Sequence, residues 1–172
     1  MATTYELVKY LSSMKVEFSL RTHQPVNSAY DRARILRIPA QMVVQTKLIK
    51  LNGCCWMVII PAHRTINFNS LGRILRSTDI RVCDLSDWDY YFPTCEISAV
   101  PPLGNLYGLN VLADISFEQG RHIVFGAYSS TQSIVMRWNL FSTLVNPVVA
   151  AICDDVANVD PPIVYCAPIH QQ

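Results

Sequence analysis

The chain has 172 residues, of which 51% are hydrophobic and 16% are charged, and its formal net charge is +1. This composition excludes an intrinsically disordered chain, and the small net charge excludes an extended polyanion-binding surface, so any RNA contact would be local and no DNA partner is expected. We expect one domain, with residues 1–145 as its body and residues 146–172 as a C-terminal extension.

Cysteine usage and hydropathy give the expected compartment. The six cysteines form neither a CxxC pair nor a zinc-ligand spacing, and they are Cys54, Cys55, Cys83, Cys95, Cys153 and Cys166. With no signal peptide at the N-terminus, this pattern predicts reduced thiols in the cytoplasm and no metal site. We interpret Cys54-Cys55 as core filling within an apolar strand. No apolar stretch reaches the roughly 18 residues that span a bilayer, so no membrane span is expected.

The N-terminal region predicts a helix and then a strand. Residues 4–14 place apolar side chains at helical spacing, with Thr3 or Thr4 available as the N-cap. Residues 15–22 alternate apolar and polar side chains, which predicts a half-buried strand. His23 follows at the expected end of that strand.

A second helix and a β-hairpin are expected next. Ser28 and Asp31 resemble a capping box for a helix that stops before Pro39. Residues 42–51 and 54–60 then predict two strands, because the Asn-Gly pair between them is the strongest short hairpin signal in the chain.

The second half continues the alternation of helices and strands. Its apolar patterns predict short helices over residues 69–76 and 84–91 and strands over residues 109–113, 122–128 and 133–138. Because helices and strands interleave and one hairpin is antiparallel, the fold class expected is mixed α/β (α+β).

Residues 95–114 form the most informative stretch. They place Pro101, Pro102, Gly104 and Gly108 ahead of an apolar run. Proline stiffens the backbone and glycine permits close approach, so such a loop can form a small polar pocket beside a sheet. A rigid connector between two strands is the alternative.

This stretch resembles the signature loop of the YbaK/prolyl-tRNA-editing family, the freestanding and synthetase-associated aminoacyl-tRNA deacylases. The matching residues are Glu96, Pro101, Pro102, Gly104, Tyr107, Gly108 and Asp114, whereas Ser98 replaces the first glycine of the family's loop. The resemblance extends over roughly residues 5–144 and implies a mixed, partly barrel-like sheet flanked by helices. It also implies hydrolysis of the ester of a mischarged tRNA in trans, in translation quality control, with the acceptor end as partner and no cofactor. Ester hydrolysis needs positioning, a polarised carbonyl and a placed water.

The resemblance implies a catalytic position that this chain fills differently. The family holds its substrate with a lysine directly before a threonine, and alignment on Thr46 puts Gln45 at that position. Glutamine supplies hydrogen bonds but no charge. Lys47 would project from the same strand face, about 7 Å further along. Lys47 is therefore either a relocated functional lysine or an ordinary solvated one.

The remaining site residues are those that the family's motifs place around the aminoacyl group. The substrate-binding set expected is Thr46, His23, Ser98, Ala99, Val100, Pro102, Gly104, Tyr128 and Ser129. Tyr128 stands where a glycine is usual, and like Ser98 it adds bulk at the pocket mouth. His23 is a candidate base or a simple hydrogen-bonding residue at a strand end.

Two hypotheses stay open from these residues. The chain is either a trans-acting deacylase or a catalytically inactive descendant that binds a small molecule, a tRNA end or a partner protein. In the C-terminal extension, residues 147–156 fit a continuation of the last helix. The apolar residues 163–165 would dock on the domain or on a second copy, the latter giving a homo-oligomer.

Overall fold

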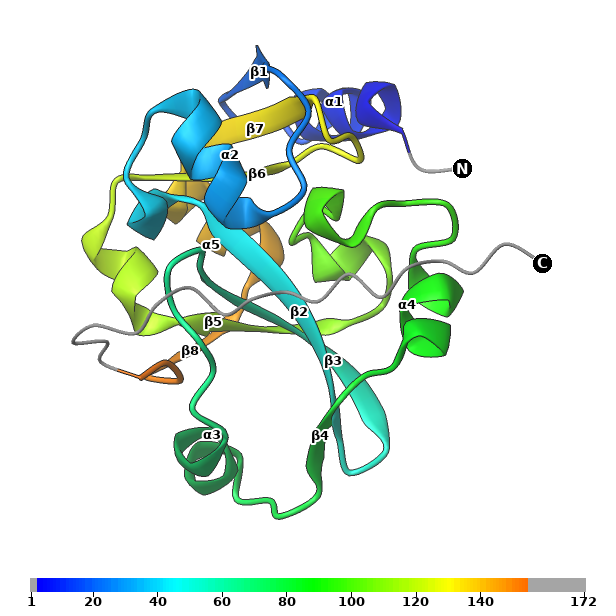
Figure 1. The fold of residues 1–172 in the computed structure, drawn as a ribbon, viewed down its shortest axis with the longest axis vertical. Coiled ribbons are helices and arrows are strands. Elements are labelled where there is room, and N and C mark those ends of the chain that lie inside the picture. The colour runs from blue at the N-terminus through cyan, green and yellow to red at the C-terminus, as the bar shows by residue number, and fades with distance from the viewer. Residues whose placement is uncertain (1–2, 155–172) are drawn as a thin grey trace.

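The computed structural model describes residues 3–154 (Figure 1). Its strands form two sheets, one of three strands in the order β1-β7-β6 and one of five in the order β4-β2-β3-β5-β8. Helices surround both sheets, so the predicted mixed α/β class is confirmed. An isolated parallel bridge between Val43 and Val124 connects the sheets, and within residues 3–154 they do not close into a barrel.

Five α-helices, eight strands and four short 3-10 helices make up the described chain. The helices are α1 (Thr4–Ser13), α2 (Ala29–Leu36), α3 (Phe68–Leu75), α4 (Leu85–Tyr91) and α5 (Trp138–Val145). The strands are β1 (Phe18–Thr22), β2 (Val44–Leu51), β3 (Cys54–Pro61), β4 (Ile80–Val82), β5 (Asn110–Asp114), β6 (His122–Gly126), β7 (Gln132–Arg137) and β8 (Val148–Ala150). None of these helices is long and apolar enough to cross a membrane.

Local signals set the helix starts as predicted. Thr3 and Glu6 form a complete capping box at α1. The Ser28 hydroxyl accepts the amide of Asp31 at the start of α2, which ends where Arg37 adopts a left-handed conformation. These caps satisfy backbone groups that a helix terminus leaves unpaired.

The predicted β2-β3 hairpin is also confirmed. Its turn residues, Asn52 and Gly53, have φ values of 50° and 79°, the positive range that favours this pair of residues in two-residue hairpins. β3 then pairs in parallel with β5, and β5 in parallel with β8. The hairpin therefore joins an antiparallel part of the sheet to a parallel one.

The C-terminal part departs from the sequence prediction. The expected continuation of the last helix through residues 147–156 is wrong, because Asn146 adopts a left-handed conformation after α5 and Pro147 follows it. The chain instead forms β8, a three-residue strand that periodicity cannot detect. The predicted docking of residues 163–165, with its homo-oligomer, lies outside the described residues.

Side chains from both sheets pack into one main core. Its aromatic centre is Trp138, whose ring centroid lies 5.5 Å from those of Phe117 and Phe141. Full burial of each such ring contributes about 1.5–3 kcal/mol. Two smaller clusters lie on the outside of the sheets, one under α3 and one under α2.

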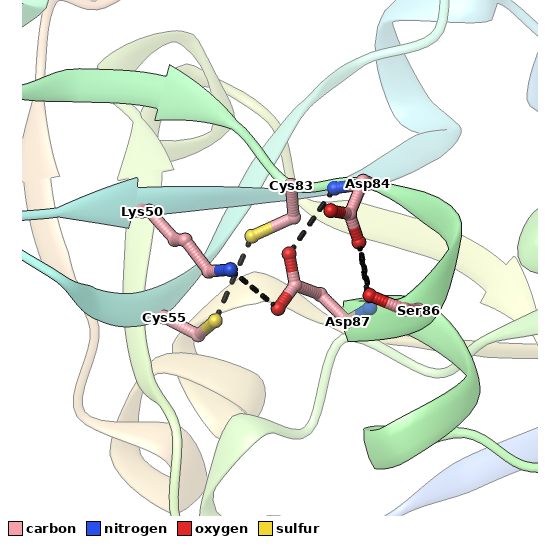
Figure 2. A network of polar contacts seen from close by, with 6 residues as sticks. All are labelled: Lys50, Cys55, Cys83, Asp84, Ser86 and Asp87. Carbon is pink, nitrogen blue, oxygen red and sulfur yellow. Dashed lines mark hydrogen bonds and ion pairs between the residues drawn. The ribbon is translucent and has the colours of Figure 1, made fainter.

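The neighbouring cysteines of β3 do not both fill the core as interpreted from the sequence. Cys54 is exposed and Cys55 is half-buried, because adjacent strand residues face opposite sides. Figure 2 shows the Cys55 thiol beside that of Cys83, with the Lys50 ammonium paired to the Asp87 carboxylate at 2.7 Å.

Candidate functional site

The predicted signature loop lies between the two sheets and bonds to both. Its turn of 3-10 helix, Ile97–Ala99, leads into the buried Val100. The Thr46 hydroxyl of β2 donates to the Val100 carbonyl at 3.2 Å, and the Tyr128 amide donates to the Ala99 carbonyl at 2.9 Å. The loop thus connects β2 to the end of β6.

A glycine on β6 allows this close packing. A Cβ built on Gly126 would lie 2.6 Å from the Ala99 Cα and 2.9 Å from its carbonyl carbon and oxygen. Real Cβ atoms do not approach backbone this closely, so any larger residue would force the strand and loop apart. Gly126 was not singled out from the sequence, since nothing local shows which segment packs against it.

A fully buried arginine holds the loop from the α2 side. Arg32 is 0% exposed, its Nε donates to the Ser133 hydroxyl at 2.8 Å, and its Nη1 donates to the Ser98 carbonyl at 2.9 Å. Burial lowers the pKa of Arg32 to about 10, against the opposing attraction of Glu96. Sequence reasoning missed Arg32 because an arginine is almost never fully buried unless it is paired, and the sequence of this short helix does not show a partner.

His23 belongs to the same hydrogen-bonded chain. Its Nδ1 lies 2.7 Å from the Gln24 carbonyl oxygen and its Nε2 lies 2.8 Å from the Ser133 hydroxyl. Because a carbonyl only accepts, Nδ1 carries the proton, and in the neutral ring Nε2 accepts from Ser133. Both ring nitrogens are therefore engaged with the protein, which matches the hydrogen-bonding alternative better than the free base.

Gln45 and Lys47 lie on the outer face of β2. Thr46 lies between them and points to the main core and the loop. Because side chains alternate along a strand, Gln45 and Lys47 point to the opposite face, which is also the face of the buried Val43 under α2. Both side chains are half-buried. Burial lowers the pKa of Lys47, and within residues 3–154 no carboxylate lies within ion-pair distance of its ammonium.

The other expected site residues fall into two groups. Pro102 and Gly104 are both buried. A Cβ on Gly104 would meet the Val111 side chain at 2.4 Å and the Leu109 carbonyl oxygen at 2.6 Å, so Gly104 allows the loop to pack against β5. Ser129 is half-buried, and its hydroxyl lies 2.9 Å from that of Thr131.

Tyr128 adopts a left-handed backbone conformation with a φ of 60°. Burial raises the pKa of its phenol, and the Coulombic effects of Cys95, when ionised, and of Glu6 act in the same direction. A non-glycine residue at positive φ is uncommon, so the native packing holds this backbone in place at the edge of the loop.

Two surface hollows lie elsewhere on the molecule. One of about 630 Å³ lies beside α3, and one of about 430 Å³ lies beside the start of α5. No predicted site residue lines either hollow. Among the described residues, no group of three His, Cys, Asp or Glu side chains is placed to hold a metal ion.

The chain matches one protein family and several solved structures. The family model of the aminoacyl-tRNA editing domain matches residues 23–144, and a search of curated proteins finds no match. A solved structure described as hypothetical protein APE2540 has a TM-score of 0.77 at 16% identity, covering 86% of this chain and 99% of its own.

Two further solved structures share the fold. A candidate trans-editing enzyme for prolyl-tRNA synthetase has a TM-score of 0.74 at 10% identity, covering 88% of this chain and 96% of its own. A candidate signal transduction protein from Marinobacter aquaeolei VT8 has a TM-score of 0.71 at 14% identity, with 88% of this chain matching 31% of that one. The matched family model spans most of the chain and includes the loop, β2 and α2, so this chain belongs to the aminoacyl-tRNA editing domain family.

Proposed function

We propose that this domain hydrolyses the ester of a mischarged tRNA in trans, using Lys47 in place of the family's lysine. The observation that carries the proposal is the state of Lys47. It shares the outer face of β2 with Gln45, it is partly withdrawn from water, and it has no ion-pair partner among the described residues. A cation in this state is available to an anionic or polarised group of a substrate.

Each neighbouring residue has a distinct role in this proposal. Gln45 binds a ribose hydroxyl or a phosphate oxygen through its amide, and Lys47 stabilises the negative charge that develops as water attacks the ester carbonyl. The aminoacyl group lies along the outer face of β2, beside these two side chains. Thr46, between them, faces the other side of the strand and fixes the loop through its bond to Val100.

The second candidate is a non-catalytic module that binds the tRNA end or another ligand. A specific feature of the loop favours it, because the Ala99 and Val100 amides already donate to the Glu96 and Ile97 carbonyls at 2.8 and 3.4 Å. Those amides are therefore not free to orient an ester carbonyl. Ser98 in place of glycine adds a side chain, which further limits how closely a substrate can approach the loop backbone.

Turnover and binding measured on the same substrates separate the two candidates. The purified chain is incubated with a panel of mischarged tRNAs, and binding of a non-hydrolysable aminoacyl-nucleotide mimic of the acceptor end is measured in parallel. Hydrolysis above the uncatalysed rate for at least one amino acid is expected. Binding without hydrolysis across the panel would leave the second candidate, and neither binding nor hydrolysis would reject both.

A further inference from the structure

The Arg32 guanidinium keeps one nitrogen without a hydrogen-bond partner. Its Nη2 is buried, and no atom of residues 3–154 accepts a hydrogen bond from it, whereas Nε and Nη1 both donate hydrogen bonds. Buried polar groups in native proteins are nearly always paired, and a buried charged donor is the costliest kind to leave unpaired. An unpaired donor of this kind marks a place where a ligand can supply the missing acceptor.

The planar shape of the guanidinium shows where that donor points. Nη2 shares one edge of the group with Nε, which bonds to Ser133 of β7, and the other edge with Nη1, which bonds to the Ser98 carbonyl. Its two N–H bonds therefore point into the region between Ser133 and Ser98. This region adjoins Ser98 of the signature loop.

The local charge balance favours an anion in this region. Among the described residues, no carboxylate lies within ion-pair distance of Arg32, and Glu96, whose charge attracts it, is exposed. With a pKa near 10 the group stays cationic at neutral pH. The Ser133 hydroxyl and the half-buried His23 are its polar neighbours, which keeps one side of the region hydrophilic.

We propose that Arg32 is a receptor for the carboxylate of a small acidic amino acid, bound between Ser133 and the Ser98 loop. With Nε and Nη1 already engaged, Nη2 offers the carboxylate a charge-assisted hydrogen bond, which is about twice as strong as a bond between neutral groups. If the proposed deacylation holds, on which this step rests, the amino acid is aspartate or glutamate esterified to tRNA. The free amino acid is the other source of the same carboxylate.

Paired ligands of nearly equal shape test the proposal without any variant. Calorimetric titration compares L-aspartate with L-asparagine and L-glutamate with L-glutamine. Within each pair, the acid and the amide differ in charge but hardly in size. Saturable binding of an acid at least tenfold tighter than its amide is expected. Equal affinities, or no binding of either acid at millimolar concentration, would overturn the proposal.

Two substitutions on the same helix assign the effect to one side chain. Arg32→Met should abolish the preference for the acid, and Arg34→Met, which removes an exposed arginine two positions away, should preserve it. Circular dichroism melting shows whether each variant folds, and Arg32→Lys provides a second variant that keeps the charge but loses the planar fork. Retention of the full preference in Arg32→Met would contradict the assignment.

Hydrolysis assays on the same amino acids distinguish this inference from the proposed function. Binding of free acids without turnover of any aminoacyl-tRNA would support the receptor and reject the deacylase. Turnover confined to neutral amino acids, with no binding of acids, would support the deacylase and reject the receptor. Preferential turnover of aspartyl or glutamyl esters would support both and identify the esterified source.

Discussion

Gly126 of β6 and Ala99 of the signature loop are in direct backbone contact, with only 2.6 Å between a Cβ built on Gly126 and the Ala99 Cα. The contact brings the loop against the three-stranded sheet, while Thr46 bonds it to the five-stranded sheet. The loop is therefore part of the junction between the sheets, and its position depends on both partners.

Replacing Gly126 by alanine should displace the loop and destabilise the domain by about 1–3 kcal/mol, because the added methyl group overpacks a backbone contact. Gly120→Ala is the matched control, since its Cβ would lie at an ordinary 3.5 Å from the Phe117 carbonyl oxygen. Urea denaturation of both variants measures the difference. Equal stabilities for Gly126→Ala and wild type would show that the loop packs elsewhere.

Thr46→Val keeps the shape of the side chain but removes the donor to the Val100 carbonyl. We expect a loss of about 1–3 kcal/mol in the free energy of unfolding, because that buried carbonyl loses its side-chain donor. Thr143→Val removes a comparable bond to the Asn139 carbonyl on an exposed helix face and should cost less. A reversed order of the two effects would contradict the proposed role of Thr46.

Asp114 at the end of β5 should make stability depend on pH in the acid range. Burial alone would raise its pKa, but hydrogen bonds from the side chain and backbone of Ser116 and from Cys153 and Ile152 outweigh burial and hold the pKa below its ordinary value. The ionised form is therefore favoured by folding. Its contribution is complete above the unfolded pKa of about 3.9 and is lost as the pH falls through the lower folded value.

Asp114→Asn should accordingly lower the free energy of unfolding by about 1–3 kcal/mol at pH 7, and the difference in stability from wild type should narrow as the pH falls below about 4. Asp89→Asn, at an exposed position on α4, is the control and should follow the wild-type curve. Thermal melts between pH 2.5 and pH 7 measure all three proteins. A gap that stays constant with pH would show that the carboxylate charge is not what stabilises this corner.

Cys55 and Cys83 should remain thiols under mild oxidation although their sulfur atoms are 3.6 Å apart (Figure 2). Cys55 lies on β3 and Cys83 directly follows β4, with β2 between these two strands, so their backbones are about two strand spacings apart, beyond the reach of a disulfide. Burial and the bond to Cys55 also raise the pKa of Cys83 to about 12, which leaves little thiolate at neutral pH. Peptide mass mapping after diamide treatment should show no Cys55–Cys83 link, and finding one would mean that β4 leaves the sheet.

The parts of the fold that follow from the sequence are those set by neighbouring residues. The capping box at Thr3, the hairpin turn at Gly53 and the shared face of Gln45 and Lys47 each depend on a few consecutive positions and backbone geometry. Tertiary contacts decide the rest. The burial of Arg32 depends on a serine about one hundred positions away, a relationship that helix periodicity does not contain.

The C-terminal strand illustrates the same limit. Residues 147–156 have enough apolar character for a helix, but the edge of β5 offers unpaired backbone groups and β8 takes them. A three-residue strand gains its stability from pairing and not from its own pattern. Such short strands can be predicted only when the sheet with which they pair is already known.

The most direct test of the proposed catalytic face is the single-turnover rate of ester hydrolysis by Lys47→Met and Lys50→Met, measured on the mischarged tRNA that wild type hydrolyses fastest. Lys50 lies on the same strand but on the opposite face, paired to Asp87, so its loss should leave the rate within about twofold of wild type. Loss of the Lys47 ammonium should lower the rate by about 10²–10³-fold, the usual effect of removing one group that stabilises the developing charge. Equal rates for Lys47→Met and wild type would show that the outer face of β2 does not carry the reaction.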